Sequence, residues 1–108
     1  MTNNAIQKNA PNYGQFEDGN QMSYAQFSNY LVTHHDKSKS FFDTNLLAKM
    51  KQYIMVSMDA VKKKLNPMKR GQCFEIFGYD FIFDAEFNTF LIEVNTNPCL
   101  LETSNLLE

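Results

Sequence analysis

The chain has 108 residues, of which 44% are apolar and 20% are charged, and this composition is typical of one ordinary globular unit. A formal net charge of −2, without a basic stripe between aromatic residues, disfavours nucleic acid as a partner. No apolar run approaches the roughly 20 residues of a membrane span, and Cys73 and Cys99 have neither CxxC partners nor a secretion signal, so we expect a cytoplasmic protein with free thiols and no membrane contact.

Polar and turn-forming residues dominate positions 1–22, which predicts an irregular loop with a short strand at its very start. A helix is predicted to follow, because Ser23 and Gln26 have the spacing of a capping box and apolar residues such as Leu31 recur at helical spacing. His34 and His35 end this helix. Adjacent histidines cannot share one helical face, so the pair favours a solvated helix end over a zinc site.

The longest predicted helix spans about residues 44–65, with Asp43 as its N-cap and Asn66–Pro67 as its stop. Methionines on an apolar stripe usually fill a core, so those on this helix are not predicted to bind a soft metal. Apolar residues at steps of three and four mark the predicted buried stripe: Leu46, Leu47, Met50, Ile54, Met58, Val61 and Leu65.

A β-hairpin is predicted after Gly71, with strands over Phe74–Phe83 and Thr89–Val94 and a turn over Asp84–Asn88. Apolar side chains occur on both faces of this strand pair. A pair of strands that is apolar on both sides favours a sheet covered by helices over an exposed ribbon. Together with the helices, the hairpin predicts an α+β fold.

The register of this hairpin brings three polar residues together. If the turn is centred between Glu86 and Phe87, Asp80 lies opposite Glu93, and Asn95 shares their face because side chains alternate with a period of two. The same register places Gly78 opposite Asn95 and Ile82 opposite Leu91. The apolar surroundings predict that this face is buried, and opposed carboxylates repel each other there.

A divalent cation is one way to relieve that repulsion. Two carboxylates and one amide are hard oxygen donors, which suit Mg²⁺ or Mn²⁺ better than Zn²⁺, and water or phosphate oxygens would complete the coordination. Opposed acids also occur where each one simply pairs with a lysine of a neighbouring element. The spacing of Asp80, Glu93 and Asn95 leaves both interpretations open.

Two long motifs resemble those of one known family. Phe77–Phe81, followed by Leu91–Pro98, resembles the C-terminal signature of the tubulin tyrosine ligase and tubulin polyglutamylase family, which is an ATP-grasp group. Thr2–Lys8, followed by Asn12–Asn20, resembles an internal segment of the same family. The motifs occur in the family's order, and the resemblance spans essentially the whole chain.

This resemblance implies that residues 1–108 are the C-terminal part of an ATP-grasp domain, an antiparallel sheet with a long packed helix that lacks the N-terminal and central lobes. It implies Asp80, Glu93 and Asn95 as Mg²⁺ ligands, with Mn²⁺ as a substitute, and Thr2 and Asn3 as contacts of ATP. No catalytic residue beyond the metal ligands is implied. Because the family's lysine-bearing lobes have no counterpart in the sequence, we expect a fragment that is inactive alone.

The activity implied by the resemblance is ATP- and Mg²⁺-dependent addition of an amino acid to tubulin through an acyl phosphate. The expected partners are a tubulin C-terminal tail and free tyrosine, glutamate or glycine, and the motifs leave the choice of amino acid open. The expected location is the cytoplasm at microtubules, with the cilium as one such place. Two alternatives remain at this point, a non-catalytic module that contacts tubulin and a different ATP-grasp enzyme that ligates small molecules.

Overall fold

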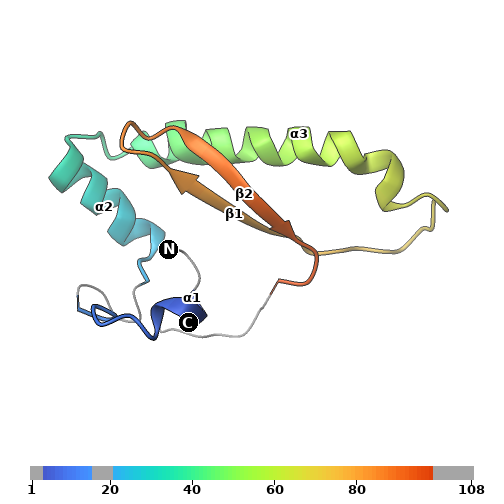
Figure 1. The fold of residues 1–108 in the computed structure, drawn as a ribbon. Coiled ribbons are helices and arrows are strands. Elements are labelled where there is room, and N and C mark those ends of the chain that lie inside the picture. Colours follow the sequence, from blue (N-terminus) through green and yellow to red (C-terminus); the bar gives the residue numbers. More distant parts are fainter. Residues whose placement is uncertain (1–3, 16–20, 99–108) are drawn as a thin grey trace. The chain divides into compact units, whose positions relative to one another are not determined.

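The computed structural model describes residues 4–15 and 21–98 and confirms the α+β class. The chain divides into two compact units, Met1–Lys39 with Leu100–Glu108, and Ser40–Cys99. None of the helices in the described part is long and apolar enough to cross a membrane. The elements follow one another as α1 (Asn4–Gln7), α2 (Tyr24–His35), the π-helical segment η2 (Phe42–Leu47), α3 (Ala48–Leu65), β1 (Gly78–Phe83) and β2 (Thr89–Asn95) (Figure 1).

The predicted N-terminal loop contains a single helical turn, α1, followed by hydrogen-bonded turns. The amide of Ala10 donates to the carbonyl of Gln7 at 2.8 Å, and the amide of Tyr13 donates to the carbonyl of Ala10 at 3.1 Å. Backbone bonds between residues three apart fold residues 4–15 locally rather than extending them. Part of the predicted short strand, residues 1–3, lies outside the described residues, and the described part that follows is helical rather than extended.

The α2 helix begins with the predicted capping box. The Ser23 hydroxyl accepts a hydrogen bond from the Gln26 amide at 3.2 Å, and the Gln26 side chain accepts one from the Ser23 amide at 2.7 Å. These two bonds satisfy amides that the first helical turn leaves without partners. The helix ends at His35, as predicted, and Asp36 caps it in the left-handed conformation with φ of 51°.

The predicted start of the long helix is wrong, because Asp43 is not its N-cap. Helical backbone already begins at Phe41, and Asp43 lies inside the first turn of η2, which runs directly into α3. Phe42 and Leu46 lie four residues apart and are both buried, so their packing extends the helix beyond the point where the capping signal would start it. The carbonyl of Ser40 accepts hydrogen bonds from the amide and the hydroxyl of Thr44, each at 2.9 Å.

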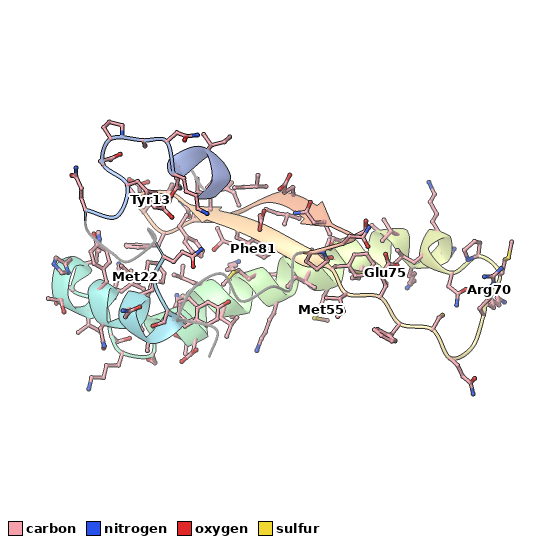
Figure 2. All side chains as sticks on the ribbon, turned by 90° about the horizontal axis from the view of Figure 1, so that it is seen from below. Tyr13, Met22, Met55, Arg70, Glu75 and Phe81 are labelled. Carbon is pink, nitrogen blue, oxygen red and sulfur yellow. The ribbon has the colours of Figure 1, made fainter. Side chains whose placement is uncertain are left out.

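The end of α3 at Leu65 agrees with the prediction, and Asn66 organises the turn that follows. The Asn66 side chain accepts a hydrogen bond from the Arg70 amide at 2.9 Å and donates one to the Arg70 carbonyl at 2.8 Å. Figure 2 shows Arg70 and Glu75 on the connection that runs out from α3 and returns to the hairpin. Residues 74–77 belong to this connection, so the first strand is shorter than predicted.

The α3 helix and the hairpin lie side by side, with β1 and β2 antiparallel (Figure 1). Most of the predicted stripe is shielded from water: Leu46 is buried, and Leu47, Met50, Ile54 and Met58 are half-buried. Val61 and Leu65 are exposed instead. Figure 1 shows the reason, because α3 continues past the end of the strands and its last turns have no sheet beneath them.

The turn of the hairpin is centred one half-residue earlier than predicted. The Phe87 amide donates to the Asp84 carbonyl at 3.0 Å, and the Asp84 amide donates to the Asn88 carbonyl at 3.2 Å. These bonds close a three-residue loop in which Phe87 has a left-handed φ of 63°. The turn is therefore centred on Glu86.

The register is correct at the end of the hairpin far from the turn and wrong near the turn. Gly78 lies opposite Asn95 and Asp80 lies opposite Glu93, as predicted. Ile82, however, lies opposite Phe90 rather than Leu91. A β-bulge between Asp80 and Phe81 accounts for the difference, because one extra residue on β2 shifts the ladder by one position.

Candidate metal centre

The hairpin has one face toward α3 and one face away from it. On the α3 face, the Tyr79 hydroxyl lies 2.7 Å from the Ser57 hydroxyl, and the rings of Tyr79 and Phe81 are stacked with centroids 6.2 Å apart. Thr89, opposite Phe83, is buried on this face. Because side chains alternate along a strand, the residues between them in β1 point to the other face, which we call the outer face.

The outer face holds the three residues that the sequence predicts as ligands. Asp80 and Glu93 are direct cross-strand partners, and the Asn95 side-chain amide donates a hydrogen bond to the Glu93 carboxylate at 3.3 Å. The structure therefore brings together all three groups.

The prediction that this face is buried is wrong, because Asp80, Glu93 and Asn95 are all exposed. The physical reason is that α3 covers only the face that carries Tyr79 and Phe81. Within the described part of the Ser40–Cys99 unit, the sheet has two strands, and its long helix, α3, lies on the face opposite the carboxylates. The carboxylates are consequently open to water and to a ligand.

The strand pairing forces two like charges together. Partial shielding from water, followed by a hydrogen bond shared with Glu93 and repulsion from its charge, raises the pKa of the Asp80 carboxyl above its ordinary value. No lysine or arginine within the described residues forms an ion pair with either group. A cation bound between the two carboxylates would remove the repulsion, so the pairing favours cation binding on this face.

The donor set fits a hard divalent cation. Two carboxylates and one amide offer oxygen ligands, and no group of three or more His, Cys, Asp or Glu side chains suited to a metal occurs in the described part of the chain. Three oxygens leave room for water and phosphate oxygens, which is how Mg²⁺ is commonly held in nucleotide enzymes. The residues present therefore fit Mg²⁺ or Mn²⁺ and do not fit a tetrahedral zinc site.

The predicted site and the structure differ in what they cover at two places. Thr2 and Asn3, predicted to contact the nucleotide, lie outside the described residues. A groove of about 330 Å³ on the α3 side was not predicted, because its walls come from helix and strand residues that are distant in the chain. The groove is lined by residues of α3 and β2: Tyr53, Val56, Ser57, Ala60, Thr89, Phe90 and Leu91.

Comparison with known proteins places these motifs in one family. The sequence profile of the tubulin-tyrosine ligase family matches residues 1–108. The chain is 28% identical over 108 residues to tubulin glycylase 3B of Tetrahymena thermophila, covering 100% of this chain and 9% of that protein. It is 31% identical over 104 residues to the probable tubulin polyglutamylase TTLL9 of Mus musculus, covering 96% of this chain and 21% of that protein.

A third relative belongs to the same group. The chain is 31% identical over 112 aligned positions to protein polyglycylase TTLL10 of Rattus norvegicus, covering 100% of this chain and 16% of that protein. The chain thus spans from 9% to 21% of the length of these three relatives.

Proposed function

This chain belongs to the tubulin-tyrosine ligase family, and on that premise we propose that its hairpin is the metal-binding part of an ATP-dependent amino-acid ligase. One observation carries the proposal. Asp80 and Glu93 are paired across the strands and lie beside Asn95 on a face that is open to ligands. We further propose that the hairpin with α3 forms the C-terminal part of an ATP-grasp domain.

The reaction we propose joins a carboxylate to an amine. A carboxylate oxygen of the protein substrate attacks the γ-phosphorus of ATP, which releases ADP and forms an acyl phosphate. The amine of a free amino acid then attacks the acyl carbon, expels inorganic phosphate and loses a proton to form the amide bond. ATP supplies the leaving group, so no oxidant or reductant is required.

The outer face has a defined part in this reaction. Asp80 and Glu93 would hold Mg²⁺, or Mn²⁺ in its place, through their carboxylates, and Asn95 would add its side-chain oxygen. A bound Mg²⁺ offsets the charge of the phosphates and favours in-line attack. Thr2 and Asn3 are proposed to contact the nucleotide. The side-chain amide of Asn95 now donates to Glu93, so it would reorient when a cation binds.

Tubulin is the proposed protein substrate. The three relatives bear the names of a tubulin glycylase, a tubulin polyglutamylase and a protein polyglycylase, which supports a carboxylate of a tubulin tail as the acceptor and an amino acid as the donor. Tyrosine, glutamate and glycine are the candidate amino acids. A role in modifying tubulin corresponds to a location at cytoplasmic or ciliary microtubules.

Metal binding can be tested on this chain by NMR in the presence of Mn²⁺, whose paramagnetism broadens signals of nearby nuclei. We expect selective broadening at Asp80, Glu93 and Asn95, and we expect Glu93→Gln to abolish it because the variant keeps the shape but removes a charged ligand. Glu86→Gln in the exposed turn is the matched control and should bind as the unmodified chain does. Equal broadening at Glu86 and Glu93 would contradict the metal site.

Ligation can be tested in a chimaera, in which this chain replaces the matching segment of mouse TTLL9. We expect ATP-dependent incorporation of a labelled amino acid into tubulin, and we expect its loss when the chimaera carries Glu93→Gln. The Glu86→Gln chimaera controls for the effects of substitution itself. Incorporation by the Glu93→Gln chimaera at the same rate as by its parent would refute the proposed role of the hairpin.

A further inference from the structure

The bulge in the hairpin separates two registers. From the turn outward, Phe83 lies opposite Thr89, Ile82 lies opposite Phe90, and Phe81 lies opposite Leu91. The next pair is Asp80 with Glu93, so Ile92 has no counterpart on β1. The shift falls directly beside the two carboxylates.

Without the bulge, the pairs near the turn would lead to a different arrangement. A regular continuation of the pairs near the turn would set Asp80 opposite Ile92, and Glu93 opposite Tyr79. A shift of one residue moves every following side chain to the other face of a sheet. Glu93 and Asn95 would then point toward α3, away from Asp80.

We propose that the bulge at Ile92 positions the metal ligands by moving Glu93 and Asn95 onto the outer face, opposite Asp80. Ile92 supplies no ligand itself. It is the extra, unpaired residue of β2, and it changes the face on which the following residues lie. Bulges beside functional sites commonly redirect side chains in this way. The role in positioning ligands rests on the proposed metal-binding function. The strand register itself does not depend on that function.

Packing against α3 gives a physical reason for the bulge to persist. With the bulge, Val94 lies opposite Tyr79 on the side of the sheet that carries Tyr79, where it is 40% exposed. In the regular ladder, the Glu93 carboxylate would take that place beside the hydrogen bond between Tyr79 and Ser57. Placing a carboxylate beside that partly buried hydrogen bond is less favourable than placing the apolar Val94 there. The bulge therefore satisfies the α3 interface and the outer face together.

Cross-strand disulfides test the register without reference to a metal. In a Cys73→Ser, Cys99→Ser background, Asp80→Cys with Glu93→Cys pairs residues that the bulge sets opposite each other. Tyr79→Cys with Glu93→Cys pairs residues that only the regular ladder would set opposite each other. Cysteines on opposed strand positions can form a disulfide, whereas those on opposite faces cannot without backbone movement. We expect mild oxidation to cross-link only the first pair, and cross-linking of only the second would overturn the bulge.

Single-residue insertions test the consequence for metal binding. One alanine inserted between Ile92 and Glu93 would move Glu93 off the outer face again, and we expect the Kd for Mn²⁺ to rise by about tenfold or more. An alanine inserted between Ala85 and Glu86 lengthens the loop without changing the strand pairs and should leave the Kd unchanged. An unchanged Kd after the first insertion would overturn the positioning role.

These measurements separate two failures. If the unmodified chain shows no Mn²⁺ binding at Asp80, Glu93 and Asn95, the proposed metal-binding function fails, and the positioning role fails with it. The disulfide pattern still decides whether the bulge aligns the two carboxylates. If Mn²⁺ binds and the disulfides form between Tyr79→Cys and Glu93→Cys, only the inference about the bulge fails.

Discussion

Ser57 and Tyr79 form a specific side-chain contact between α3 and the hairpin. The Ser57 hydroxyl lies 2.8 Å from the Ile54 carbonyl and 2.7 Å from the Tyr79 hydroxyl. Its single hydrogen is donated to the Ile54 carbonyl, which can only accept. The Tyr79 hydroxyl is therefore the donor to Ser57. This contact anchors the residue that precedes Asp80 in β1.

Removing the Ser57 hydroxyl should destabilise the chain. Ser57→Ala leaves the partly buried Tyr79 hydroxyl without its acceptor, and we expect a loss of about 1–3 kcal/mol in the free energy of unfolding, measured in urea. The same substitution in a Tyr79→Phe background should cost less, because no hydroxyl is then left unsatisfied. Equal costs in the two backgrounds would show that the hydrogen bond contributes nothing specific.

Asp84 stabilises the turn through its charged carboxylate. The carboxylate accepts hydrogen bonds from the Asn88 side chain at 2.8 Å, from the Asn88 amide at 2.7 Å and from the Glu86 amide at 3.1 Å. These bonds stabilise the charged form of the carboxyl and so lower the pKa of Asp84 below its ordinary value. The bond from the Asn88 side chain has the largest effect, and the backbone amides add to it.

The lowered pKa predicts a loss of stability in acid. A carboxyl with a lowered pKa in the folded state contributes stability above its unfolded pKa, and this contribution is lost as pH falls through the folded value. Unfolding midpoints measured from neutral pH downward should therefore fall less for Asp84→Asn than for the unmodified chain. Parallel pH profiles for the two proteins would contradict this role of Asp84.

The strands and helices were largely predictable, but their exact alignment was not. Helical spacing predicted α3 and its end at Asn66, since the apolar stripe and the proline that follows are local signals. The exact centre of the turn was not predictable, because Phe87 adopts a left-handed conformation. That conformation usually occurs at glycine or asparagine, so phenylalanine gives no signal for it. The bulge was also missed, because no single residue type marks it.

Gly78 at the start of β1 has little room for a side chain. A Cβ atom there would lie 3.0 Å from the Cβ of Pro98 and 3.7 Å from the Cβ of Asn95. We expect Gly78→Ala to lower the free energy of unfolding by about 1–3 kcal/mol, because overpacking displaces the neighbouring chain. It should also weaken Mn²⁺ binding by moving Asn95.

Gly71 provides the matched control for this substitution. A Cβ atom at Gly71 would meet nothing within 4 Å, so Gly71→Ala should change neither stability nor Mn²⁺ binding measurably. Urea unfolding and the NMR titration measure both effects. A similar loss of stability in the two variants would show that the contact with Pro98 is not the cause.

The Ser40–Cys99 unit as a whole is apolar on both faces of its hairpin. On the outer face, Ile82 is 48% exposed and its cross-strand partner Phe90 is 52% exposed, whereas α3 packs against the other face. Exposed apolar strands promote association between chains. These exposed side chains lie on the same face as the carboxylates that we propose as metal ligands.

Reducing the apolar surface of the outer face should lessen association. We expect Ile82→Thr with Phe90→Thr to raise the protein concentration at which light scattering detects aggregates, because threonine retains strand propensity and is more polar. The control pair is Phe81→Thr with Phe83→Thr, which should unfold the hairpin instead, because these side chains are half-buried and Phe81 stacks on Tyr79. Unchanged aggregation in the first pair would assign the association to another surface.

The sequence by itself determined α2, most of α3, the two strands and the family. These features follow from local periodicity, capping residues and contiguous motifs, which short stretches of chain contain in full. Only the tertiary structure decided that α3 covers the Tyr79 face and leaves the carboxylates exposed, and that Ile92 forms the bulge that aligns them. These outcomes depend on which residues distant in the chain pack together, and burial is a property of that packing rather than of any segment alone.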